Sequence, residues 1–175
     1  MVKLINDNFK ITTILSKGIQ TDYLTASLLE QFEEKEVLLW QDKNMYFPCK
    51  RIQLSFGVHL LELLKQHIEE FNVLIINKFK DNVSNQDIKT FIESISTMEE
   101  MKDKQVIIFV STNANDIELK HCFNLESTIK NHSDQVLTLN KTKPQEYILQ
   151  NLINGEIVKL KEQLKGYRTQ LLIIE

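Results

Sequence analysis

Residues 73–76 read VLII, a continuous apolar run that ends at Asn77. This pattern is typical of a strand in the middle of a parallel sheet, because helices cover such a strand on both faces. Residues 106–110 read VIIFV and have the same character. Residues 84–98, between the two runs, place apolar side chains at helical spacing after Ser84, a residue type that favours helix N-caps. These segments predict a strand, a helix and a second strand of one parallel sheet.

The same alternation extends in both directions along the chain. Further strands are predicted at residues 9–15, 37–40, 51–54, 135–139 and 171–174, and further amphipathic helices at residues 23–32 and 58–71. Such an order implies right-handed crossovers between parallel strands, with helices on both faces of the sheet.

The segment 144–164 allows two interpretations. Tyr147, Ile148 and Leu152 fit a helix, whereas residues 156–161 fit an edge strand that pairs through a turn at Gly166 with the last strand. We therefore predict a single α/β domain over residues 1–175, with a mostly parallel sheet and a C-terminal β-hairpin.

The composition argues against several classes of protein. The 175 residues carry a net charge of −3, with four Gly and two Pro, which argues against a basic DNA-coating protein and against long flexible linkers. Cys49 and Cys122 are too few and too far apart for a disulfide framework or a zinc site, and we expect no metal ion. The first ten residues are mixed polar and apolar, so we expect neither a secretory signal nor a membrane span. We expect a nuclear protein in a eukaryote and a cytoplasmic one otherwise.

The turn after the first predicted strand has the spacing of a phosphate-binding loop without its residues. Such a loop needs two glycines, a Lys for the phosphates and a Ser or Thr for magnesium at the start of a helix. Ser16 occupies the first glycine position, and Thr21, Asp22 and Tyr23 occupy the Gly, Lys and Ser/Thr positions. Asp22 replaces a phosphate-binding cation with an anion, so we expect no nucleotide cofactor and no ATPase activity. The alternative is an ordinary polar turn between a strand and a helix in an unrelated α/β fold.

Two other strand ends have matching positions. Asn77 follows the central strand where a nucleotide site needs an acidic residue to help hold magnesium, and Asn carries no charge for a metal. The polar residues Ser111, Thr112 and Asn113 end the strand at 106–110, where RecA-like proteins keep a residue that senses the γ-phosphate.

The stretch 50–80, KRIQLSFGVHLLELLKQHIEEFNVLIINKFK, resembles the recombinase paralogues of the RecA family. In them a short Arg-Ile strand, a Leu-rich helix and an apolar strand with a terminal acid follow one another. The resemblance continues through residues 106–113, 133–139 and 156–175, and so covers nearly the whole chain at low motif specificity. It implies a RecA-like fold.

The resemblance also implies a role in homologous recombination and DNA repair. Small members of the family without a nucleotide site include subunits of Shu-type complexes, which bind a second paralogue or a SWIM-domain protein and assist the recombinase on DNA. The departures at Thr21, Asp22, Tyr23 and Asn77 fit such an accessory subunit. Three alternatives stay open: a RecA-like scaffold of the Elongator kind outside recombination, a DnaB-like modulator of replication, and a small α/β enzyme whose site the sequence does not reveal.

The C-terminal third concentrates basic residues, which are candidates for contact with DNA phosphates. They are Lys141, Lys143, Lys159, Lys161, Lys165 and Arg168. Tyr167, between Gly166 and Arg168, can stack on a base. The alternative is a solvated charged face without a ligand.

Two large aromatic residues, Trp40 and Phe47, lie on either side of the polar segment 41–46. Aromatic side chains in such a setting can anchor a protein partner, and they can equally close the edge of the sheet.

Overall fold

The computed structural model describes residues 3–41, 50–53, 60–77, 84–112, 117–122 and 125–174. Within these residues nine strands form one sheet in the order β3-β2-β4-β5-β1-β6-β7-β8-β9. The strands are β1 (Ile11–Ser16), β2 (Val37–Gln41), β3 (Lys50–Gln53), β4 (Val73–Ile76), β5 (Gln105–Ser111), β6 (Gln135–Lys143), β7 (Glu146–Asn151), β8 (Ile157–Lys165) and β9 (Arg168–Ile174).

The first six strands are parallel and the last three are antiparallel. β4 pairs with β2 on one side and β5 on the other, and β1 lies between β5 and β6. The predicted central strand is therefore confirmed, and all four of its side chains are buried. The antiparallel pairings of β6 with β7, β7 with β8 and β8 with β9 then extend the sheet.

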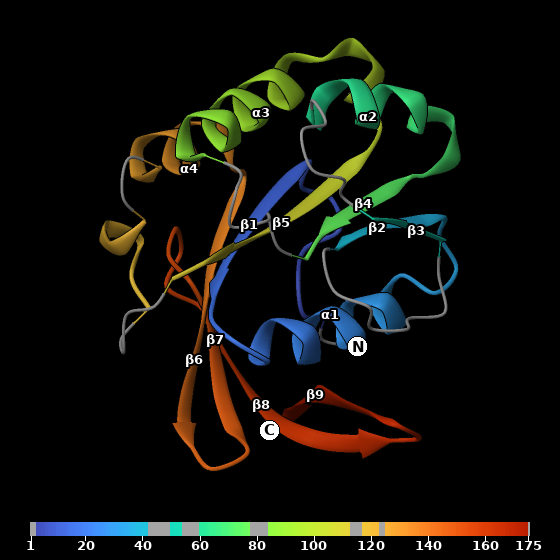
Figure 1. The fold of residues 1–175 in the computed structure, drawn as a ribbon. Coiled ribbons are helices and arrows are strands. Elements are labelled where there is room, and N and C mark those ends of the chain that lie inside the picture. The colour runs from blue at the N-terminus through green and yellow to red at the C-terminus, as the bar shows by residue number, and fades with distance from the viewer. Residues whose placement is uncertain are drawn as a thin grey trace.

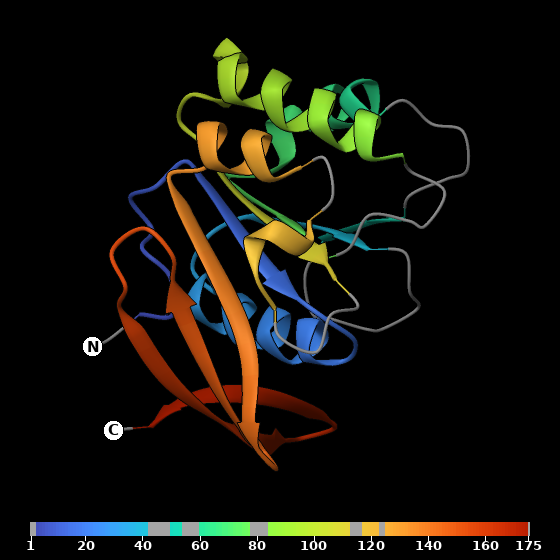
Figure 2. The ribbon, with the colours of Figure 1, turned by 90° about the vertical axis from the view of Figure 1, so that its left-hand side faces the viewer.

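Helices cover both faces of the parallel part, as predicted. α1 (Gln20–Gln31) packs on one face through Leu24 and Leu28. On the other face lie α2 (Leu60–Gln66), α3 (Asn85–Thr97) and α4 (Glu126–His132), which belong to a second apolar cluster. Ser84 caps α3, because its hydroxyl accepts a hydrogen bond from the amide N–H of Asp87 at 3.1 Å. Figures 1 and 2 show the two layers of helices with the sheet between them.

The C-terminal strands curl around α1. Figure 2 shows β6, β7 and β8 crossing the side of the molecule, with α1 enclosed between them and the parallel strands. The helix considered for residues 147–152 is wrong, because this segment is β7 and its side chains alternate between buried and half-buried positions. The pairing of the last two strands through Gly166 is confirmed, but β8 lies inside the sheet and β9 forms its edge.

Ser27 of α1 covers part of the open edge of β9. Its hydroxyl donates to the carbonyl oxygen of Leu171 at 2.8 Å and accepts from the amide N–H of Leu171 at 2.7 Å. One side chain thus takes the place of a neighbouring strand for both backbone groups of a buried residue. This contact fixes α1 against the C-terminal hairpin.

Candidate functional site

The candidate site lies where β1 ends and α1 begins. Three residues separate the two elements, and Gly18 among them has a φ of +57°, a left-handed conformation that glycine adopts without steric cost. The turn brings the start of α1 next to the carboxyl end of β4, where the residue after the strand is Asn77. The positions that the sequence analysis selected are therefore brought together by the fold.

Three amide N–H groups in the first turn of α1 are bonded to carbonyl oxygens of the preceding turn. Thr21 donates to the carbonyl oxygen of Gly18 at 3.3 Å, and Asp22 and Tyr23 donate to that of Ile19 at 3.0 and 3.1 Å. A phosphate-binding loop instead leaves such groups directed at the ligand. The backbone here resembles an ordinary helix start more than an anion cradle.

Asn77 is hydrogen-bonded to the first turns of α1. Its amide nitrogen Nδ2 donates to the hydroxyl of Thr25 at 2.8 Å and to the carboxylate oxygen Oδ1 of Asp22 at 3.3 Å. The Thr25 hydroxyl in turn donates to the carbonyl oxygen of Thr21 at 2.7 Å. Asp22 and Asn77 are 5% and 3% exposed, so this network is closed to bulk water. The two side chains that the sequence pattern assigns to the lysine and metal-acid positions are thus hydrogen-bonded to each other.

Ser16 and Tyr23 complete the set of altered positions. The hydroxyl of Ser16 is fully buried and hydrogen-bonded to the hydroxyl of Thr21. Tyr23 packs partly buried against the apolar cluster that α1 shares with the C-terminal strands. The residue that the sequence pattern assigns to the Ser/Thr position therefore contributes a ring to the core.

The comparisons with known proteins agree with this architecture. No protein-family model matches the sequence, and no curated protein matches it either. Among solved structures, the crystal structure of the RadB recombinase matches with a TM-score of 0.64 over 87% of this chain and 86% of that chain, at 10% sequence identity. The chain has a RecA-like fold.

The strand end predicted to sense a γ-phosphate is only partly described. In this RecA-like sheet Ser111 ends β5 with an exposed side chain, and Thr112 is buried and donates its amide N–H to the carbonyl oxygen of Ser16 at 3.1 Å. Asn113 lies outside the described residues. Thr112 therefore lies next to the turn that follows β1.

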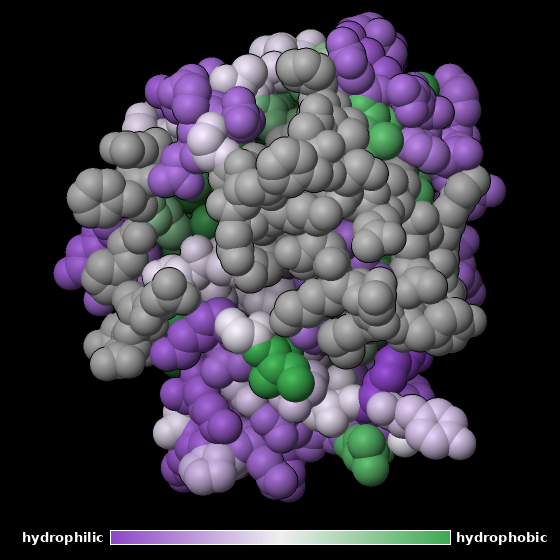
Figure 3. All heavy atoms as spheres, viewed as in Figure 1, coloured by the Kyte–Doolittle hydropathy of each residue, from purple (hydrophilic) through white to green (hydrophobic). Residues whose placement is uncertain are grey.

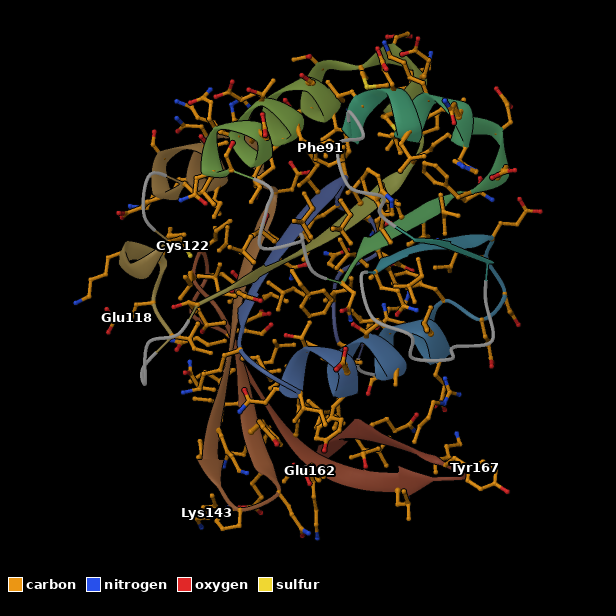
Figure 4. All side chains as sticks on the ribbon, in the orientation of Figure 1. Phe91, Glu118, Cys122, Lys143, Glu162 and Tyr167 are labelled. Atoms are coloured by element: carbon orange, nitrogen blue, oxygen red, sulfur yellow. The ribbon has the colours of Figure 1, made fainter. Side chains whose placement is uncertain are left out.

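The predicted DNA-binding residues do not form one patch. Figure 4 shows Lys143 at the end of the β6–β7 hairpin and Tyr167 at the tip of the β8–β9 hairpin, well apart and both directed outward. Lys141 lies on a different face from Lys143, with its Nζ 5.8 Å from the centre of the Tyr147 ring. Lys159 and Lys161 are exposed along β8.

The remaining two basic residues face α1. The Nζ of Lys165 lies 2.8 Å from a carboxylate oxygen of Glu30, and this hydrogen bond holds the pKa of Glu30 below its ordinary value. Lys165 and Arg168 line a cavity of about 810 Å³ between α1 and the β8–β9 hairpin, together with Glu30, Glu33 and Gln170. The charge of this part of the predicted patch is therefore largely balanced by acidic residues.

The structure corrects the role considered for Trp40. Trp40 is fully buried, and its ring centre lies 5.5 Å from that of Phe91 on α3. A side chain in the core of the sheet cannot also be a surface anchor for a partner, so Trp40 is a packing residue. Phe47, the second residue of that pair, lies outside the described residues.

Thr25 belongs to the candidate site and was not identified from the sequence. It follows Thr21 by four residues and Asp22 by three, so the three side chains share one face of α1. The polar side chains at positions 21, 22 and 25, beside the apolar face of α1, are the signal that could have identified it.

Among the described residues, no helix is long and apolar enough to cross a membrane.

Proposed function

We propose that the chain is a noncatalytic RecA-like subunit of a complex that assists homologous recombination and DNA repair. It acts through a protein partner, either another RecA-family paralogue or a SWIM-domain protein, and through the recombinase. Similarity of fold to a protein described as a recombinase supports the biological setting. The hydrogen bond between Asn77 and Asp22 carries the noncatalytic part of the proposal.

The physical argument concerns what the site offers to a nucleotide. A phosphate group placed here would meet the carboxylate of Asp22, and the amides of Thr21 and Asp22 already have carbonyl partners. Binding would require breaking a buried hydrogen-bonded network and bringing two negative charges together. The start of α1 and the end of β4 therefore serve as a structural joint between helix and sheet.

Nucleotide titration tests the noncatalytic part. A site with a Kd of about 10 µM would stabilise the protein by about 2.7 kcal/mol at about 1 mM MgATP, which raises Tm by several degrees. We expect a shift of less than one degree and no phosphate release above the buffer rate. A shift of several degrees that depends on magnesium would contradict the proposal.

Purification from the native host, with protein identification by mass spectrometry, tests the biological setting. We expect a recombinase paralogue or a SWIM-domain protein to copurify. Recovery of transfer-RNA-modification subunits without recombination proteins would favour an Elongator-like scaffold, and replication proteins would favour a DnaB-like modulator.

We further propose that DNA contact, made within the assembled complex, uses Tyr167. Its side chain is fully exposed at the hairpin tip, next to Gly166, which has a φ of +64°. An unobstructed ring on a tight turn suits stacking on an unpaired base, worth about 1–3 kcal/mol. Tyr167→Ala in the purified complex should weaken binding of a single-stranded oligonucleotide about fivefold or more, measured by fluorescence anisotropy. Unchanged affinity would exclude the hairpin tip as the DNA contact.

A further inference from the structure

One face of the C-terminal sheet carries no helix from the part of the chain that the structure describes. In Figures 1 and 2 the described helix α1 lies on one side of β7, β8 and β9, and no described helix lies on the opposite side. On the α1 side Leu160 is fully buried and Tyr147 is 2% exposed. On the opposite side, here called the outer face, Ile157 is 54% exposed and Leu172 is 37% exposed.

The strand registers show which side chains share the outer face. Lys159 pairs with Ile148 on β7 and with Ile174 on β9, and Lys161 pairs with Leu172. Because directly opposed residues point to the same side of a sheet, these side chains are neighbours. The patch consists of Lys159 and Lys161 among four aliphatic residues, Ile148, Ile157, Leu172 and Ile174.

The aliphatic side chains on this face call for an explanation. An antiparallel sheet with one solvated face normally carries polar residues on that face. Isolated apolar side chains at a surface are common, and Figure 3 shows several in a largely hydrophilic lower half of the molecule. The four aliphatic side chains here instead surround Lys159 on adjacent strands. They form a contiguous apolar area of the kind found in interfaces.

The charges on the outer face are predominantly positive. Lys143 and Lys161 stand on either side of Glu146 in one row across β6, β7 and β8, and Lys159 lies one row away. Within these two rows, three lysines and one glutamate leave a net charge of +2. A complementary surface is therefore both aliphatic and acidic.

We propose that the outer face of β7, β8 and β9 binds a polypeptide segment that combines aliphatic side chains with Asp or Glu. This inference rests on the proposed function, in which the chain acts through protein partners. A protein segment suits the patch better than a nucleic acid, because isoleucine offers no aromatic ring for base stacking and gains nothing against phosphates. Aliphatic contacts supply the buried apolar area, and the lysines orient the acidic groups around it.

Site-specific photocrosslinking in the native host tests the inference. A benzophenone amino acid replaces Ile157 in one variant and Leu164 in a matched control. Leu164 lies on the same strand and is more exposed, at 73%, but the strand alternation places it on the opposite face. We expect position 157, and not position 164, to crosslink to one protein, and the crosslinked peptide to contain aliphatic and acidic residues.

A synthetic copy of the crosslinked peptide then gives a quantitative test by titration. Ile157→Asp and Lys159→Glu should each weaken its binding at least tenfold, whereas Leu164→Asp should leave the affinity within twofold of the wild-type value. All three positions are exposed, and unchanged thermal unfolding of each variant confirms that it folds.

The other outcomes separate this inference from the proposed function. Crosslinks from position 157 to DNA, or to a second copy of this chain, would overturn the inference. A recombination protein captured by the wild-type chain but crosslinked only from position 164 would overturn it and leave the proposed function standing. An acidic and aliphatic segment from a protein outside recombination would support the inference and contradict the proposed function.

Discussion

Asn77 and Asp22, far apart in the sequence, are joined by a hydrogen bond of 3.3 Å between Nδ2 and Oδ1. The bond connects the end of the central strand β4 to the first turn of α1. The sequence pattern assigns residue 77 to a position where a nucleotide site needs an acid, and residue 22 to one where it needs a cation. The observed hydrogen bond supports the proposal that this site does not bind magnesium and phosphate.

Asn77→Asp should destabilise the protein and make its stability depend on pH. The new carboxylate would face that of Asp22 in a buried site, so the folded variant would retain a proton that the unfolded chain releases above about pH 4. The free energy of unfolding should therefore fall as the pH rises, with a loss of about 2–4 kcal/mol near pH 7. Urea unfolding at pH 5 and pH 8 measures the effect.

Asn77→Ala is the control for this variant. It removes the hydrogen bonds to Thr25 and Asp22 without adding a charge, and should cost about 1–3 kcal/mol at both pH values. An Asn77→Asp protein as stable at pH 8 as at pH 5 would show that the two side chains are not in direct contact.

Ser27→Ala should destabilise the contact between α1 and β9. The hydroxyl of Ser27 serves both the amide N–H and the carbonyl of Leu171, which is 1% exposed, so its removal leaves two buried backbone groups unpaired. We expect a loss of about 1–3 kcal/mol in urea unfolding and faster hydrogen exchange at the amide of Leu171.

Ser127→Ala on α4 is the matched control for Ser27. Ser127 is also a helical serine, but it is exposed and its hydroxyl only accepts a hydrogen bond from Asn131. Its replacement should change stability by less than about 0.5 kcal/mol. Equal effects of the two substitutions would contradict the role given to Ser27.

The parallel core could be predicted because its strands are long apolar runs. Residues 73–76 and 106–110 are buried on both faces. Such strands consist of continuous apolar residues, which can be recognised directly in the sequence. β7 was missed because it alternates buried and half-buried side chains and contains Tyr147 and Ile148, which also fit a helical spacing. Only the pairing with β6 and β8 decides between the two structures.

The position of the candidate site could be predicted from the sequence, but the hydrogen bonds between its side chains could not. The turn after β1 and the end of β4 follow from the order of elements, whereas the bonds of Asn77 to Asp22 and Thr25 depend on how α1 lies on the sheet. The basic patch shows the reverse case. Lys143, Lys165 and Arg168 have the same strand alternation as Lys161. Lys165 and Arg168 nevertheless line the cavity beside α1, and this placement depends on how the β8–β9 hairpin lies against α1.

Trp40→Phe should be better tolerated than most substitutions that shorten a core side chain. The indole Nε1 of Trp40 is buried and has no hydrogen-bond partner among the described residues, so losing that N–H offsets part of the lost packing against Phe91. We expect a loss of stability below about 2 kcal/mol, against about 3–5 kcal/mol for Trp40→Ala.

Binding of the copurified partner to Trp40→Phe should be unchanged, because Trp40 is a core residue. Loss of the partner by a variant that remains stable would restore Trp40 as a contact residue.

Cys122 should make the protein less stable at alkaline pH. The thiol follows the short 3₁₀ turn at Leu119–His121 and is buried, and burial raises its pKa to about 11 (Figure 4). In the unfolded chain the thiol ionises near pH 8.5, so between about pH 9 and 11 the folded state holds a proton that the unfolded state has released. The free energy of unfolding should therefore fall over this range by up to about 1.4 kcal/mol per pH unit from this group alone.

Cys122→Ala is the control, because Tyr and Lys residues also titrate in this range. The free energy of unfolding is measured against pH for the protein with and without Cys122, each in a Cys49→Ser background, and the difference between the two slopes is the contribution of the thiol. In that background a thiol reagent at pH 8 should label Cys122 only as fast as the protein opens. Rapid labelling of the folded protein, or equal alkaline slopes with and without the thiol, would contradict the burial of Cys122.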